Sequence, residues 1–335
     1  MTQKKTKPNI IYISELNIPS KSAYSIHVFK MCESFSKLGY KTTLFTCNSK
    51  NLTKAFRNYN VNFKFDIISV FNKFQKLDFL IIFIFSIKIL TRNFDKKSIF
   101  ISRSILFALF ASTLKKGVIL ELHHEITGFS RIIYFSFKYL GLIKDLKYIF
   151  LHKRLQQFYK INTKMSIVLD DASDIENFKQ KKNKKIKKTC VYIGSFFEGK
   201  GVEQIFRLAK QNKKIFFHIY GEKKYLKDKK KEKNLKIFEY VNYSQIPKIL
   251  SKYEIALMPY QKKVKGRASI NLEKYMSPLK MFDYLAAKML IIASNLSVYK
   301  HILKNDFNCK LVRVNDDEEW SKVINILFSK NNINN

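Results

Sequence analysis

Residues 9–46 read NIIYISELNIPSKSAYSIHVFKMCESFSKLGYKTTLFT, and the order of their apolar and polar residues decides the fold. Residues 10–14 are rich in β-branched and aromatic side chains, which is typical of a strand. After the loop ELNIPSKSA, an amphipathic helix is predicted over residues 24–38, and Gly39 marks its end. The strand pattern resumes at residues 42–46. A strand, a helix, a glycine and a second strand in this order predict a parallel βαβ unit.

The second half of the chain repeats this alternation of strands and helices. Two more buried strands are predicted in the first half, at residues 98–102 and 118–122. In the second half, strands are predicted at residues 190–193, 215–220, 254–258 and 289–293, with helices at residues 202–211 and 244–252 and after Ser277. Strands that alternate with helices favour a parallel, doubly wound sheet. Because the pattern occurs twice, we expect an α/β protein with two doubly wound, Rossmann-like domains that face each other.

The lysine-rich segment KQKKNKKIKK, at residues 179–188, is expected to link the two domains or to lie in an exposed loop close to the link. The expected boundaries are residues 1–178 for the N-terminal domain and residues 189–320 for the C-terminal domain. A C-terminal helix with a frayed tail is expected at residues 321–335. The Lys/Glu-rich loop at residues 222–233 is expected to be solvated.

Composition limits the class of protein. A chain of 335 residues favours two domains over one. No long apolar stretch follows the first lysines, so no secretory signal is expected. The longest apolar run, residues 79–87, is far shorter than the ~20 residues that a membrane-spanning helix needs. The four cysteines (Cys32, Cys47, Cys190 and Cys309) are scattered and lack zinc-site spacing, which fits a reduced, cytoplasmic interior.

The formal net charge of +37 leaves three interpretations open: a solvated basic surface, a surface that leans on anionic lipid, or a nucleic-acid binder. No RNP-type motif, GxxG loop or zinc-finger spacing is present, so we expect no nucleic-acid partner. Residues 71–94 and 129–150 mix apolar residues with Lys and Arg, as interfacial helices do, but ordinary core helices would show the same mixture. The expected location is therefore the cytoplasm, either throughout it or at the inner face of the membrane.

Residues 275–287, YMSPLKMFDYLAA, carry the most specific functional signal. Ser277 suits a helix N-cap, and Pro278 suits the first helical position. The start of a helix presents unpaired N–H groups and partial positive charge, which favour a phosphate, and Lys280 adds a cation in the first turn. Asp283 lies roughly 7.5 Å further along the helix axis, a spacing that suits the ribose hydroxyls of a nucleotide. The ligand this predicts is a nucleotide diphosphate that carries a sugar.

Other candidate residues of the second half also follow predicted strands, where ligands bind in doubly wound sheets. They are Gly194, the turn Gly199-Lys200-Gly201, Gly221 with Glu222, and Pro259 with Tyr260. Each has a plain structural explanation by itself, such as a tight turn, an ordinary helix cap or a solvated residue. Their recurrence at strand ends within one half favours a shared phosphate-binding site, in which Lys200 supplies a second cation.

In the first half, His123 and His124 follow a predicted strand within ELHHE. Three interpretations remain open: a structural strand-end histidine, a metal cluster with Glu121 and Glu125, or a site histidine that faces the cleft. Neighbours in an extended chain point in opposite directions, so only alternate residues of this run can converge.

Two further features of the first half are candidates for contact with a substrate. Ser20, Lys21 and Ser22 lie in the loop after the first strand, in place of a glycine-rich backbone. Arg103 ends another strand, where it would either face the cleft or form a surface ion pair.

These segments, taken in order, resemble family 4 glycosyltransferases. Residues 9–46 resemble the opening of that family, and VILELHHE resembles its strand that ends in histidine. VYIGSFFEGKGVEQIFRLAK, IYGE, EIALMPY and MSPLKMFDYLAAKMLIIAS resemble its donor-binding domain. The resemblance covers nearly the whole chain and is weak over residues 48–94 and 128–150.

The resemblance implies a GT-B fold, in which two Rossmann-like domains face each other across a cleft that holds the active site. It implies a nucleotide-sugar donor on the second domain, a glycan or lipid-linked acceptor on the first, retention of anomeric configuration, and no metal or other cofactor. Carried over by position, His123 lies near the donor sugar and Lys200 at the diphosphate, while Asp283 binds the ribose. The remaining implied donor contacts are Gly194, Ser195, Gly199, Gly221, Ser277, Pro278, Leu279 and Lys280, and the expected acceptor contacts are Ser20, Lys21, Ser22 and Arg103.

The sequence departs from the family pattern at three points. Tyr275 stands where a carboxylate usually contacts the donor sugar, and Ser195 stands where an arginine often accompanies the lysine. The Gly-Gly of the first loop is absent. These departures concern which sugar is transferred.

The expected function is therefore sugar transfer in the assembly of a cell-surface polysaccharide. No carboxylate stands out as a nucleophile, so departure and attack on one face of the sugar is the expected route. The alternatives are a nucleotide-sugar epimerase of the same fold and a non-catalytic binding module.

Overall fold

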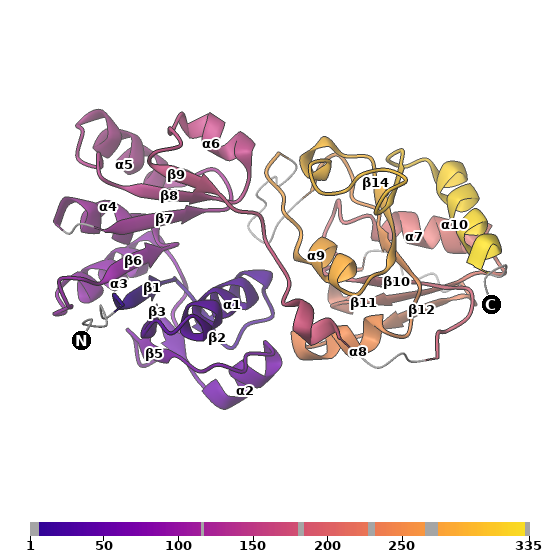
Figure 1. Ribbon diagram of the computed structural model, residues 1–335, viewed down its shortest axis with the longest axis horizontal. Helices are drawn as coiled ribbons and strands as arrows, with labels where there is room; N and C mark the ends of the chain where they lie inside the picture. The colour runs from indigo at the N-terminus through magenta and orange to yellow at the C-terminus, as the bar shows by residue number, and fades with distance from the viewer. Residues whose placement is uncertain (1–6, 115–116, 180–183, 227–231, 265–273, 332–335) are drawn as a thin grey trace, which may run out of the picture. The chain divides into compact units, whose positions relative to one another are not determined.

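The computed structural model describes residues 7–114, 117–179, 184–226, 232–264 and 274–331 (Figure 1). The chain divides into two compact units, Met1–Asp170 and Asp171–Asn335. The division comes before the expected boundary at residue 178, because residues just after Asp170 bond within the second unit. The backbone N–H of Asp171 donates to the hydroxyl of Ser277 at 3.1 Å, and the hydroxyl of Ser173 donates to Asp283.

Residues of three expected loops or tails fall outside the described residues. These are residues 180–183 of the lysine-rich segment, 227–231 of the solvated loop and 332–335 of the tail. The described end of the lysine-rich segment belongs to the second unit, since the ammonium of Lys185 donates to the backbone oxygen of Tyr253 at 2.7 Å.

The first unit is built on a parallel sheet of seven described strands in the order β5-β3-β1-β6-β7-β8-β9. The strands are β1 (Ile10–Ile13), β3 (Thr42–Thr46), β5 (Asp66–Ser69), β6 (Ile99–Ser102), β7 (Val118–Leu122), β8 (Lys147–Phe150) and β9 (Ser166–Val168), with a separate pair β2 (Asn17–Ile18) and β4 (Asn48–Ser49). The helices are α1 (Ala23–Lys37), α2 (Leu52–Asn58), α3 (Phe79–Leu90), α4 (Ile105–Leu114), α5 (Gly128–Tyr139) and α6 (Lys153–Tyr159). The predicted βαβ unit is confirmed, because β1 and β3 pair in parallel with Ile10 opposite Thr42.

The second unit is built on a parallel sheet of six described strands in the order β12-β11-β10-β13-β14-β15. The strands are β10 (Thr189–Ile193), β11 (Phe216–Tyr220), β12 (Leu235–Phe238), β13 (Ile255–Met258), β14 (Leu290–Ser294) and β15 (Lys310–Val312). The helices are α7 (Val202–Gln211), α8 (Ile246–Leu250), α9 (Leu279–Ala286) and α10 (Asp317–Asn331), and the 3₁₀ turns of the chain are η1 (Ile175–Phe178), η2 (Lys223–Tyr225), η3 (Tyr243–Gln245) and η4 (Ser297–Tyr299). The predicted α/β class with two doubly wound units is confirmed.

Two apolar clusters cover the second sheet. One contains Met281 and Tyr284 of α9, and the other contains Ile205 of α7 and Trp320 of α10. Trp320 is fully buried in this core, and its helix α10 begins at Asp317, four residues before the expected start of the C-terminal helix at residue 321.

All four cysteines are buried and free. Among the described helices, none has the length and apolar character needed to cross a bilayer.

Candidate functional site

The start of α9 differs in one respect from the expectation. The helix begins at Leu279, its N-cap residue is Pro278, and no side chain caps it. Ser277 is not the cap, because its hydroxyl accepts a hydrogen bond from the backbone N–H of Asp171 instead. Lys280 lies in the first turn and Asp283 follows one turn later, as predicted.

Lys280 places a buried cation at the end of β10. Its Nζ lies 3.5 Å from the ring centroid of Tyr192 and 5.4 Å from that of Tyr260. Within the described part of the chain, this buried Nζ has no hydrogen-bond partner. Burial lowers the pKa of Lys280 well below its usual value, the charge of Lys200 lowers it further, and Asp283 opposes the shift. A desolvated ammonium without a partner is costly, so an anion bound here would be strongly favoured.

Gly194 provides the space for this cation. Its φ is +155°, and a Cβ added to it would overlap the end of the Lys280 side chain. Gly221 lies against the same place, because a Cβ there would meet the carbonyl oxygen of Gly194. The structure therefore brings together Gly194, Gly221 and Lys280, three of the predicted donor contacts. Ser195 lies beside them, and its backbone oxygen accepts a hydrogen bond from the hydroxyl of Tyr192 at 2.7 Å.

Lys200 approaches the same aromatic ring from a different turn. Its Nζ lies 4.9 Å from the ring centroid of Tyr260, and burial lowers its pKa to about 8. Lys200 stands just before α7, whose N-cap is Gly201 at a φ of +80°. A Cβ at Gly201 would overlap the carbonyl oxygen of Pro259, so the turn requires glycine here. The backbone oxygen of Gly199 accepts the N–H of Gln261 at 2.9 Å, which fixes the turn against the loop after β13.

Asp283 is buried and bonded within the second unit. Its Oδ1 accepts hydrogen bonds from the hydroxyls of Ser173 and Tyr243, the latter at 2.9 Å. Burial raises the pKa of Asp283 to about 6, although both hydrogen bonds and Lys280 act in the opposite direction. Hydroxyl groups are thus its observed partners, which is the chemistry expected of a residue that binds ribose.

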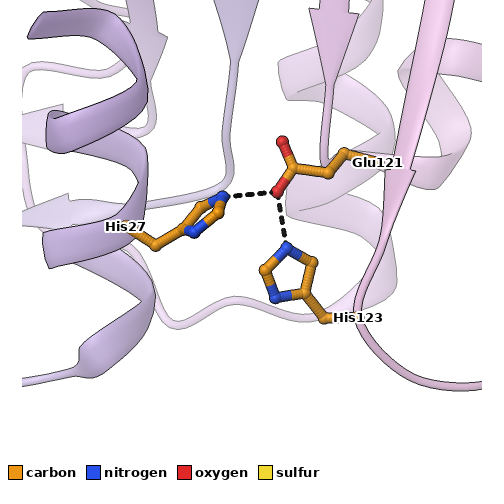
Figure 2. A group of neighbouring side chains, drawn as sticks. All are labelled: His27, Glu121 and His123. Carbon is orange, nitrogen blue, oxygen red and sulfur yellow. Dashed lines mark hydrogen bonds and ion pairs between the residues drawn. The ribbon is translucent and has the colours of Figure 1, made fainter. Parts of the chain in front are cut away.

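In the first unit, Glu121 holds a compact polar cluster at the end of β7 (Figure 2). Its Oε1 lies 2.5 Å from Nε2 of His123 and 2.7 Å from Nε2 of His27. Its Oε2 accepts the hydroxyl of Tyr12 at 2.5 Å. Sequence reasoning missed His27, which comes from α1, because no local motif links it to Glu121.

The cluster fixes the charges of its members. Burial would raise the pKa of Glu121, but the charge of His27 and the hydrogen bonds from His123 and His27 hold it well below its usual value. Burial, followed by the charge of Arg103, lowers the pKa of His123 to about 4. Glu121 is therefore ionised and His123 is neutral at neutral pH.

The metal interpretation fits these residues poorly. Within the described residues, the group that could hold an ion is His27, Glu121 and His123, rather than the expected set with His124 and Glu125. Both Glu121 oxygens already accept hydrogen bonds, and NH1 of Arg103 lies 3.8 Å from Oε1. A guanidinium this close opposes the binding of a cation.

The expected acceptor contacts have local roles in the structure. Ser22 caps α1 by accepting the N–H of Ser25, and Ser20 shares hydroxyl contacts with both residues. Lys21 is exposed. Arg103 is mostly buried and lies 3.8 Å above the ring of Tyr24, so the alternative of a surface ion pair was wrong.

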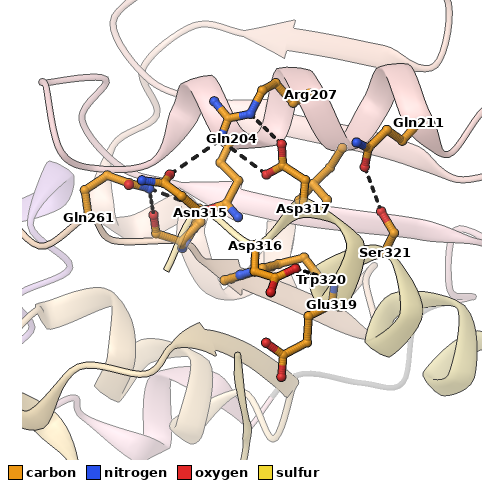
Figure 3. Close-up of polar contacts among 12 residues, drawn as sticks. Gln204, Arg207, Gln211, Gln261, Asn315, Asp316, Asp317, Glu319, Trp320 and Ser321 are labelled. Carbon is orange, nitrogen blue, oxygen red and sulfur yellow. Dashed lines mark hydrogen bonds and ion pairs between the residues drawn. The ribbon is translucent and has the colours of Figure 1, made fainter. Parts of the chain in front are cut away.

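A cavity of about 480 Å³ lies beside the Gly199 turn and was not predicted. Its lining residues include Gly199, Gln204, Arg207, Gln261 and Asn315, and ion pairs and hydrogen bonds tie Arg207 to Asp317 beside it (Figure 3). Gly199, one of the predicted donor contacts, lines this cavity, whereas Lys200, Lys280 and Asp283 do not.

Residues 173–335 match the family described as "Glycosyl transferases group 1". This match covers nearly all of the second unit. The match contains the whole predicted donor site of Lys200, Lys280 and Asp283, and it supports a transferase as the class of enzyme.

Solved glycosyltransferases share the fold of the whole chain. A glycosyltransferase from Rickettsia africae is 15% identical, with 96% of this chain and 88% of that chain covered and a TM-score of 0.69. TarM from S. aureus is 12% identical, and the match covers 97% of this chain and 93% of TarM with a TM-score of 0.71. HepE from Anabaena, in complex with UDP and glucose, is 10% identical, and the match covers 95% of this chain and 89% of HepE with a TM-score of 0.65. The likeness confirms the GT-B fold class, and no match was found among curated proteins.

Proposed function

We propose that this protein transfers a sugar from a nucleotide diphosphate sugar to a glycan or lipid-linked acceptor, with retention of configuration, in the assembly of a cell-surface polysaccharide. One observation carries the proposal. Two ammonium groups, those of Lys200 and Lys280, converge on the ring of Tyr260 beside the N-terminus of α9. A diphosphate is the anion whose size and charge suit two cations and a helix start.

The donor half of the proposal assigns a role to each part of the second-unit site. Lys200 and Lys280 hold the diphosphate, together with the backbone at Ser277–Leu279. Asp283 accepts the ribose hydroxyls, in the way it now accepts those of Ser173 and Tyr243. The nucleotides named for similar structures support this class of ligand, since HepE is described with UDP and with UDP-glucose.

The first unit supplies the acceptor half. His123 is assigned to the donor sugar, and Ser20, Lys21, Ser22 and Arg103 are assigned to the acceptor. The ring of a neutral His123 can accept a hydrogen bond from a sugar hydroxyl or donate one to it, without adding charge to the site. Glu121 sets the orientation of its ring through the bond to Nε2.

The chemistry follows from the charges that develop. As the bond from the anomeric carbon to the diphosphate oxygen breaks, negative charge grows on the diphosphate, where two fixed cations stabilise it. The acceptor oxygen forms the new bond on the same face, and its proton passes to the departing diphosphate. Double displacement would need a free carboxylate nucleophile. Glu121 and Asp283 are poor candidates, because both are buried and already accept hydrogen bonds.

A thermal-shift panel of UDP-, GDP- and ADP-sugars tests the donor site, because a ligand that binds the folded state raises the unfolding temperature. We expect one nucleotide class to stabilise the protein and Lys200→Ala or Lys280→Ala to abolish the shift. Lys210→Ala, an exposed change on α7, is the matched control. If no nucleotide sugar stabilises the wild-type protein, the proposed function is wrong. If NMR shows that a UDP-sugar is converted with no acceptor present, the protein is an epimerase.

A further inference from the structure

Helices α3 and α5 expose large apolar side chains in stripes. On α3, Leu80, Phe83 and Ile87 recur at helical spacing and are all exposed, with Leu80 at 63%. On α5, Ile132 is 62% exposed and Tyr139 is 91% exposed. Among the described residues of α5, only Tyr134 is buried, so this helix contributes little to the core.

The two stripes form one surface. The rings of Phe79 on α3 and Phe129 on α5 meet edge to face, with centroids 4.9 Å apart. Phe110 of α4 joins them from beneath, since it contacts Phe83 at 5.9 Å and Phe137 at 5.8 Å. Figure 1 shows α3, α4 and α5 in a row along one side of the first unit. We call the outer surface of α3 and α5 the α3–α5 face.

The segments that contain and flank α3 and α5 are rich in basic residues. Residues 71–94 and 128–147 contain eight basic residues and two acidic ones, Asp78 and Asp145. The basic residues are Lys73, Lys76, Lys88, Arg92, Arg131, Lys138, Lys144 and Lys147. All but Lys138 are exposed. Apolar anchors among cations match the chemistry of a bilayer surface, where anionic headgroups lie next to hydrocarbon.

We propose that the α3–α5 face docks on a lipid bilayer that carries anionic headgroups. A second copy of the chain is a poorer occupant, because stacking two such faces would bring sixteen like charges against four opposite ones (twice eight and twice two). The helices lie on the bilayer rather than across it, since the 12 residues of α3 span only roughly 18 Å. This inference goes beyond the proposed function and does not depend on it. Only a role for the α3–α5 face in reaching a lipid-linked acceptor would rest on the proposed function.

Flotation with phospholipid vesicles tests the proposal. We expect the full-length protein to float with vesicles of phosphatidylcholine and phosphatidylglycerol at low salt, and to float far less with phosphatidylcholine alone or at high salt. The double change Leu80→Glu with Ile132→Glu removes two anchors. The quadruple change Lys76→Gln, Lys88→Gln, Arg131→Gln and Lys144→Gln removes four cations. Each is expected to lower the vesicle partition coefficient at least about tenfold, since each basic residue contributes measurably near such a surface.

Matched control variants lie in the second unit. Phe307→Glu changes an apolar side chain that is 84% exposed, and the quadruple change Lys248→Gln, Lys252→Gln, Lys300→Gln and Lys304→Gln removes the same charge. Both should float like the wild-type protein. Circular dichroism and the unfolding temperature check that every variant folds.

Three results would overturn the proposal. The first is a wild-type protein that fails to float with anionic vesicles. The second is a control variant that loses as much binding as its partner on the α3–α5 face. The third is a dimer in light scattering that Leu80→Glu dissolves, which would make a second copy the occupant. Thermal shifts with nucleotide sugars should stay unchanged in all face variants, so failure of the donor site is distinguished from failure of the face.

Discussion

The ammonium groups of Lys200 and Lys280 lie over one aromatic ring, that of Tyr260, at 4.9 Å and 5.4 Å from its centroid. One lysine comes from the turn before α7 and the other from the first turn of α9, about eighty residues later in the chain. Each ammonium is desolvated, and the charge of Lys200 disfavours protonation of Lys280. A bound dianion would compensate for both effects. Three predictions below concern this site, and a fourth concerns Glu121 in the first unit.

The affinity for a nucleoside diphosphate should fall as the pH rises above about 8. Without ligand, burial lowers the pKa of Lys200 to about 8, so this side chain loses its proton in that range. The anion favours the protonated form, so binding raises the pKa and takes up protons. Isothermal titration at about pH 7 and about pH 9, in buffers of different ionisation enthalpy, measures both effects.

Lys200→Met should remove the part of this proton uptake that Lys200 supplies, and Lys210→Met should leave it unchanged. An affinity that stays constant across this range would contradict the assignment of Lys200 to the diphosphate.

Asp283→Asn should separate recognition of the ribose from recognition of the phosphates. The amide keeps an oxygen for the hydroxyls of Ser173 and Tyr243 but loses the charge that strengthens bonds to ribose hydroxyls. We expect about tenfold or greater loss of affinity for a nucleoside diphosphate and little change for inorganic pyrophosphate. Competition binding with both ligands measures the difference.

Lys280→Met serves as the contrasting variant, because it should weaken both ligands. Equal losses for nucleotide and pyrophosphate in Asp283→Asn would show that Asp283 does not read the pentose.

Glu121→Gln should destabilise the first unit. The substitution removes the carboxylate charge of Glu121, which Tyr12, His27 and His123 all contact. Weakening hydrogen bonds to a buried charged group costs about 1–3 kcal/mol, which urea unfolding can resolve. The pKa of His123 should fall further, since the charge and hydrogen bond of Glu121 now raise it, and NMR titration of the ring measures this.

The control is Glu176→Gln, which alters a surface ion pair with Lys179 and should change stability little. An unchanged His123 titration in Glu121→Gln would refute the coupling between the two side chains.

Gly194→Ala and Gly201→Ala should fail in different ways. A Cβ at Gly194 meets the flexible end of Lys280 at a φ of +155°, so donor binding should weaken in addition to the stability lost to the strained backbone. A Cβ at Gly201 meets the backbone of Pro259 at a φ of +80°, so the protein should lose at least about 1 kcal/mol of stability. Ligand titration and urea unfolding of the two variants separate these outcomes.

Gly128→Ala isolates the effect of backbone conformation, because φ there is +60° and no atom lies within 4 Å of the added Cβ. If Gly201→Ala is no less stable than Gly128→Ala, the close approach to Pro259 does not constrain the turn.

The sequence predicted the central strands and α7 well, because their patterns are local. The observed bounds of β3, β7 and α7 match the expected residues, since continuous apolar runs or a clear amphipathic period define each one. The strands β9, β12 and β15 were not predicted, because they are short and only partly buried and their apolar pattern is weak.

Long-range contacts account for the other differences. The bond from Asp171 to Ser277 joins residues 106 positions apart, and it both moved the unit boundary and replaced the expected helix cap. His27 joins Glu121 across α1 and β7, and no local pattern connects them. The lysine, glycine and aspartate residues of the proposed donor site could be singled out from the sequence because they belong to short motifs at strand ends.

Diffraction from crystals soaked with a nucleoside diphosphate tests the central claim most directly. The proposal predicts phosphate oxygens within hydrogen-bond distance of Nζ of Lys200 and Nζ of Lys280, with the ribose at Asp283. A nucleotide bound elsewhere, or phosphates that contact neither lysine, would contradict it.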